Sequence, residues 1–105
     1  MAYYCVTFRI ANKSVGGKTY ADRYELLMQN ARTQGLGFWE ETTSFLLAES
    51  TLSTPAFAKN VSEGLSSADD LVFVFDPADM SASYFGALAE LNVLQSFFPK
   101  LKKVQ

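Results

Sequence analysis

The sequence contains no histidine among its 105 residues. This absence excludes Ser-His and Cys-His nucleophiles and any metal site that depends on imidazole ligands. The single cysteine, Cys5, cannot form a disulfide within the chain, and its place in a strand-like segment is typical of a buried thiol. An enzyme of this composition would have to use carboxylates, Lys, Arg, Tyr or a cofactor, and no motif indicates a bound cofactor.

The chain also lacks a strong charge of either sign and a long apolar run. Nine basic and eleven acidic residues give a net charge of -2, which does not favour nucleic acid as a partner except at a local site. No apolar segment approaches the roughly 20 residues that cross a bilayer. Residues 1–10 alternate apolar and polar side chains rather than forming a targeting segment. We therefore expect a cytoplasmic protein with no membrane partner.

Apolar residues are plentiful, at 49% of the chain, with 14% aromatic. This is enough to build one core in a chain of this length, so we predict a single domain over residues 1–105. Apolar residues that recur every two positions indicate strands, and those that recur about every 3.6 positions indicate helices. Capping residues, Gly and Pro mark where these elements begin and end. The pattern predicts a strand at 2–10, a helix from Thr19 to Gly35, two strands within 36–50, a helix at 55–66, a strand at 71–75 and a helix at 81–98.

This order, β-α-β-β-α-β with an added C-terminal helix, indicates an α+β, ferredoxin-like fold with a four-stranded antiparallel sheet. In that fold the strand at 71–75 lies at an edge, yet its sequence "LVFVF" is apolar on both faces. Something must therefore cover the open face of the sheet, either the last helix of this chain or a second copy. We favour a homodimer. The residues predicted to form its interface are Tyr3, Cys5, Val72, Val74, Tyr84 and Leu88.

The segment "NKSVGGKT", residues 12–19, resembles a phosphate-binding loop. It supplies the Gly-Lys-Thr of that motif, but Asn12 stands where the first Gly belongs. One interpretation is a flexible loop before a helix that Thr19 caps. A second is an anion site without hydrolysis, formed by Gly16, Gly17, Lys18 and Thr19 at the helix N-terminus.

Four aspartates bracket the strand at 71–75, namely Asp69, Asp70, Asp76 and Asp79. Clustered carboxylates can bind Mg²⁺ or Ca²⁺, which makes Asp76 and Asp79 the candidate metal ligands. Asp is equally common where strands and turns end, which is the alternative interpretation. The aromatic residues permit a third hypothesis, an apolar pocket for a small ligand as in some other ferredoxin-like dimers, although no particular small molecule is indicated.

The segment "FWEETTSFLLAES", followed by a short helix and "DDLVFVFD", resembles small ferredoxin-like proteins related to the CRISPR-associated adaptation subunit and to virulence-associated nuclease-like proteins. The resemblance covers residues 2–86. It implies a homodimer and, in active nucleases of this group, an Asp at the end of the first strand that binds a shared metal. Here that strand ends "TFRIAN", with Arg9 and no acid, so no catalytic residue is carried over.

These observations predict a small homodimeric, non-catalytic binding or assembly module. The alternative is a divergent metal-dependent nuclease or phosphate-handling enzyme that uses Lys18, Asp76 and Asp79.

Overall fold

A computed structural model describes residues 1–105 and shows a mixed α+β fold with one six-stranded sheet and three helices. The strands are β1 (Ala2–Arg9), β2 (Phe38–Trp39), β3 (Phe45–Ser50), β4 (Leu71–Phe75), β5 (Ala82–Gly86) and β6 (Lys102–Lys103). The helices are α1 (Tyr20–Ala31), α2 (Thr54–Val61) and α3 (Leu91–Phe97). None of the helices combines the length and the apolarity needed to span a bilayer.

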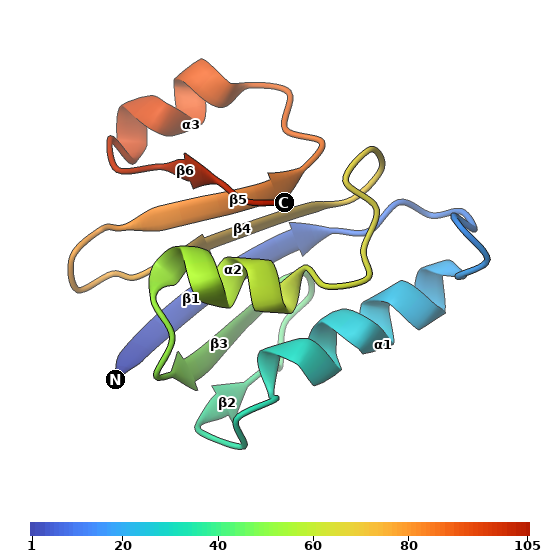
Figure 1. The fold of residues 1–105 in the computed structure, drawn as a ribbon, viewed down its shortest axis with the longest axis horizontal. Helices are drawn as coiled ribbons and strands as arrows, with labels where there is room; N and C mark the ends of the chain where they lie inside the picture. The colour runs from blue at the N-terminus through green and yellow to red at the C-terminus, as the bar shows by residue number, and fades with distance from the viewer.

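The six strands are arranged in the order β2-β3-β1-β4-β5-β6. Every neighbouring pair is antiparallel except β5 and β6, which are parallel, so the sheet is mixed. In Figure 1, α2 crosses in front of the sheet with α1 beside it, whereas α3 lies at the β5–β6 end. The sheet therefore has one face that two helices cover and a second face that a single helix covers only in part.

The main core lies between the sheet and the two helices α1 and α2. Alternation along β1 predicts that Tyr4, Val6 and Phe8 face this core, and their exposed fractions of 2%, 0% and 7% confirm it. Phe57 of α2 stacks on Tyr4 with ring centroids 4.7 Å apart. Burial of large side chains such as these supplies most of the hydrophobic stabilisation of a domain of this size.

The helix boundaries follow local capping chemistry. Thr19 caps α1 and forms a reciprocal capping box with Asp22, as the sequence indicates. Helix α2 has Ser53 as its N-cap, and its hydroxyl accepts from the Ala56 amide. The chain leaves α2 at Val61, earlier than the predicted end at residue 66.

The prediction of one long helix at 81–98 is wrong. Residues 82–86 form β5, whose side chains are buried on both faces because α2 lies over one face and α3 over the other. The sequence "ASYFG" suits a strand covered on both sides, and the helical spacing of Tyr84 from Leu88 does not reflect a continuous helix. Gly86, at φ +100°, ends the strand, and the helix that follows spans only seven residues.

Because of β5, the prediction that the strand at 71–75 lies at an edge is also wrong. Strand β4 is central, and its second face is covered by the chain's own C-terminal segment. The ring of Phe98 packs on Phe73 and Phe75, with centroids 5.0 Å and 5.1 Å away. The alternative in which the last helix folds back onto the sheet is therefore correct for the β4–β5 half of that face.

Candidate functional site

The "GGKT" segment forms a tight turn. Val15 and Lys18 exchange two backbone hydrogen bonds, of 2.9 Å and 3.0 Å, in which each amide donates to the other residue's carbonyl. Gly16 and Gly17 lie between them with φ of +57° and +80°, a conformation that glycine adopts without steric cost. The Lys18 amide is therefore satisfied inside the turn instead of pointing toward a ligand.

A carboxylate of the chain itself occupies the N-terminus of α1. The Thr19 amide donates to Oδ2 of Asp22 at 2.9 Å, and the Asp22 amide donates to Oγ1 of Thr19 at 3.0 Å. Hydrogen bonds from Thr19 lower the pKa of Asp22 below its ordinary value, and the bond from the Thr19 amide contributes more than the bond from its hydroxyl. The ammonium of Lys18 donates to the carbonyl of Gly64 at 3.2 Å. A phosphate at this position would have to displace Asp22 and would meet its negative charge.

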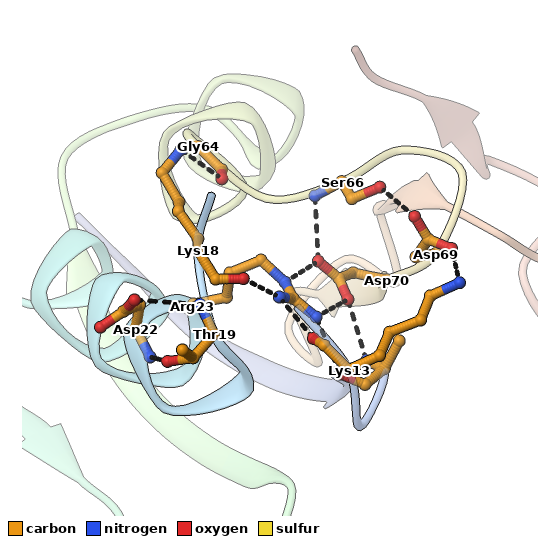
Figure 2. A network of polar contacts seen from close by, with 10 residues as sticks. Lys13, Lys18, Thr19, Asp22, Arg23, Gly64, Ser66, Asp69 and Asp70 are labelled. Atoms are coloured by element: carbon orange, nitrogen blue, oxygen red, sulfur yellow. Dashed lines mark hydrogen bonds and ion pairs between the residues drawn. The ribbon is translucent and has the colours of Figure 1, made fainter. Parts of the chain in front are cut away.

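A buried ion pair beside this loop lies at the centre of a network of polar contacts (Figure 2). The Arg23 and Asp70 side chains are 1% and 0% exposed, and Nε of Arg23 donates to Oδ2 of Asp70 at 2.9 Å. The Arg23 guanidinium also donates to the carbonyls of Ala11, Lys13 and Lys18 at 2.8–3.0 Å. With the bond from Nη2 to Oδ1 of Asp70, all five of its N–H donors have an acceptor.

Asp70 completes the network from the other side. Its carboxylate accepts from the amides of Ala11 and Ser66, both at 2.9 Å, and its carbonyl accepts from the Ala87 amide at 2.8 Å. The pair therefore connects the loop after β1, the loop before β4 and the end of β5. Since every lone pair and donor is used within the chain, Asp70 is a structural anchor and not a free metal ligand.

The neighbouring Asp69 lies at the surface of the same region. Lys13 Nζ is 2.9 Å from its Oδ1, and the Ser66 hydroxyl donates to Oδ2 at 2.7 Å. The bond with Lys13 is the main cause that lowers the pKa of Asp69. Figure 2 shows this exposed pair next to the buried one.

The two predicted metal ligands, Asp76 and Asp79, line one polar groove together with Lys100. Both carboxylates bind the β4–β5 turn, since Asp76 accepts from the Ala78 amide and Asp79 accepts from the amide and hydroxyl of Ser81, at 2.7–2.9 Å. The Ser81 hydroxyl is the main cause that lowers the pKa of Asp79. No group of three or more acidic or thiol side chains is placed to hold a metal ion.

The second face of the sheet is left uncovered over β1, β3 and β2. We call this surface the open half-face and define it by its outward side chains Tyr3, Cys5, Trp39, Phe45 and Leu47. The exposed fractions of Tyr3, Trp39 and Leu47 are 69%, 39% and 40%. An open groove of ≈ 400 Å³ runs across this surface, with Cys5 and Leu47 among its lining residues and Pro77 at one side.

Strand register places one apolar row across the open half-face. Trp39 lies opposite Leu47, Leu47 opposite Cys5, and Cys5 opposite Phe75. These four side chains form one row across four strands, and Phe98 covers the row only at Phe75. The row therefore passes from Phe75, which the chain's own Phe98 covers, directly onto exposed surface.

The structure distributes the six predicted interface residues over three environments. Val72 and Val74 are fully buried under α1 and α2, so they offer no surface to a partner. Tyr84 is 8% exposed beneath the C-terminal segment, and Leu88 packs against the apolar cluster to which Tyr84 belongs. Tyr3 and Cys5 are the two that the structure brings together on the open half-face.

Sequence reasoning considered Trp39 as part of an aromatic platform, but it missed Leu47 as a surface residue and Arg23 as a core residue. Trp39 and Leu47 fall on the Cys5 face only through the strand register, which a sequence read strand by strand does not supply. For Arg23 a signal existed, because Arg23, Leu27 and Ala31 follow one another at spacing four and all three are buried. An Arg at an apolar helix position indicates a buried acid partner, and Asp70 directly precedes the buried strand β4.

The thiol of Cys5 provides a test of the open half-face. Its partial burial, and to a lesser extent the charge of Asp76, raise the pKa of Cys5 above the ordinary value of 9.0. We expect the pH profile of iodoacetamide alkylation to have a higher midpoint in the native protein than in the chain unfolded by urea, because the thiolate is the nucleophile. Asp76→Asn should move the native midpoint downward. A native midpoint at or below that of the unfolded chain would contradict the described surroundings of Cys5.

No protein-family model matches this chain, and neither a curated protein nor a solved structure is detectably similar to it.

Proposed function

We propose that this protein is a non-catalytic binding and assembly module of ferredoxin-like type that forms a homodimer through the open half-face. The observation that carries the proposal is the exposure of Tyr3, Trp39 and Leu47 beside one another on a rigid sheet. Exposed apolar side chains that form one contiguous surface are typical of protein interfaces. The ferredoxin-like assignment is supported by the order β2-β3-β1-β4, in which all neighbours are antiparallel and α1 and α2 cover one face.

The phosphate-handling alternative has less support from the same geometry. The amides of Lys18 and Thr19 bind within the chain, and Asp22 brings negative charge to the N-terminus of α1. Asp76 and Asp79 bind their own turn and share their groove with Lys100, which opposes a cation there. The small-ligand alternative would need an enclosed pocket, whereas the groove at Trp39 is open to one side along its length.

Alkylation of Cys5 at fixed pH, measured over protein concentrations from nanomolar to high micromolar, tests the proposed dimer. We expect the rate per molecule to fall as the concentration passes the dissociation constant, because the partner then covers the open half-face. The matched control places a single thiol on the opposite side of the molecule, at the exposed position 59 of α2, in the double variant Cys5→Ser, Lys59→Cys. Its rate should not depend on concentration.

Two results would count against the proposal in different ways. A dimer seen by light scattering with a constant Cys5 rate would place the interface elsewhere. A constant alkylation rate with no dimer at any concentration would refute the homodimer itself.

A further inference from the structure

The exposed side of α3 is a second apolar surface of the monomer. Leu91, Val93 and Phe97 are 41%, 53% and 69% exposed, and no residue of α3 is buried. Val93 and Phe97 are four residues apart and so lie on one side of the helix. Residues 91–98, "LNVLQSFF", contain no charged side chain. Exposure of these apolar side chains to water is unfavourable, so the helix would be stabilised by burial of this side.

The two apolar surfaces account for most of the exposed apolar residues of the protein. Nine large apolar side chains are exposed, and six of them belong to α3 or to the open half-face. The two surfaces occur on the same side of the sheet, since α3 packs on Phe73 and Tyr84 through Leu94 and Phe98. The β4–β5 half of this side is therefore raised by a helix, while the β1–β3–β2 half lies at the level of the sheet.

We propose, resting on the homodimer above, that each copy places its α3 on the open half-face of the other. A two-fold axis across this side of the sheet brings the raised half of one copy over the low half of its partner, and the same contact is then made twice. Phe97 and Val93 of one chain cover Tyr3, Cys5 and Leu47 of the other. The layer between the two sheets consists of two α3 helices, one from each copy.

The surface area and the charges agree with this arrangement. The exposed fractions of Tyr3, Trp39, Leu47, Val93 and Phe97 correspond to on the order of 500 Å² per copy, taking about 150–250 Å² for each large side chain. A stable interface of standard size buries about 800 Å² per partner, so these residues supply most of what is needed. No charge of α3 loses its hydration on docking, because the helix has none.

Acidic side chains on the open half-face distinguish two ways in which the copies could meet. Glu49 lines the groove of the open half-face, and Glu41 accepts from the indole of Trp39 at 3.0 Å. Direct stacking of two open half-faces would bring the acidic side chains of the two copies together, whereas reciprocal docking places the uncharged α3 against them.

Disulfide cross-linking tests this geometry. Phe97→Cys leaves two thiols in the chain, Cys5 on the open half-face and the new one on α3. We expect mild oxidation with diamide to give a covalent dimer of twice the 11.6 kDa chain mass on a non-reducing gel. Peptide mapping should identify the bond between positions 5 and 97, and adding Cys5→Ser should abolish it. Val93→Cys provides a second variant that retains Phe97, in case its loss weakens the dimer.

The control is Lys59→Cys, which should give no covalent dimer because α2 lies on the other side of the sheet. The inference fails if both α3 variants sediment as dimers but form no bond to Cys5. It also fails if the unmodified protein cross-links through Cys5 alone, since that result places two open half-faces against each other and leaves the homodimer intact. If the unmodified protein is a monomer, both the proposed function and this inference are refuted.

Discussion

Replacement of Asp70 with Ala is expected to lower the free energy of unfolding by about 3–5 kcal/mol, the usual cost of leaving a buried charge without its partner. The Arg23 guanidinium is 1% exposed and would keep only backbone carbonyls as acceptors. The amides of Ala11 and Ser66 would lose their acceptor at the same time. For a chain of this length the whole stability is on the order of 5–15 kcal/mol, so the loss is a large part of it.

Urea unfolding at fixed protein concentration, followed by the fluorescence of the single Trp39, measures this effect. Asp70→Asn keeps the size of the side chain and should shift the midpoint in the same direction if Asp70→Ala fails to fold. The matched control is Asp69→Asn, which changes the adjacent, partly exposed partner of Lys13 and should leave the midpoint almost unchanged. Equal shifts for Asp69→Asn and Asp70→Asn would contradict the structural role assigned to the buried pair.

Leu47→Glu is expected to convert the proposed dimer to monomer over the micromolar range. Leu47 lies in the middle of the open half-face, so two new carboxylates would be buried in each dimer without partners. At roughly 1.5 kcal/mol or more for each carboxylate, the dissociation constant should rise about 100-fold or more. Because the side chain is 40% exposed in the monomer, the fold itself should tolerate the change.

The matched control for Leu47→Glu is Tyr20→Glu. Tyr20 is 42% exposed, nearly the same as Leu47, but it begins α1 on the other side of the sheet, where a carboxylate is favoured by the helix N-terminus. Far-UV circular dichroism should be unchanged for both variants, and only Leu47→Glu should lose the dimer. Dissociation by Tyr20→Glu alone would move the interface to the helical side.

The predictable part of the fold depended on local periodicity and capping. Alternation in β1, the Thr19 capping box and the apolar run of β4 could all be predicted because each is encoded by residues close in sequence. The error at 81–98 arose because a strand buried on both faces loses its alternation and then resembles part of a helix. That one error concealed β5 and therefore placed β4 at an edge.

The open half-face was only partly predictable, for a different physical reason. Tyr3 and Cys5 could be assigned to the outward face from alternation in β1 alone. Their neighbours Trp39 and Leu47 join them through strand pairing between distant segments, and pairing registers are set by the whole sheet. The turn at Gly16 and Gly17 shows the opposite case, in which a local motif suggested a ligand site while its donors are used within the chain.

Sedimentation equilibrium of the unmodified protein at micromolar concentrations tests the central claim most directly, with Leu47→Glu run beside it. The homodimer predicts twice the 11.6 kDa mass for the unmodified protein and the single-chain mass for the variant. A mass of 11.6 kDa for the unmodified protein throughout this range would contradict the account, because the open half-face and α3 would then remain exposed in the working form of the molecule.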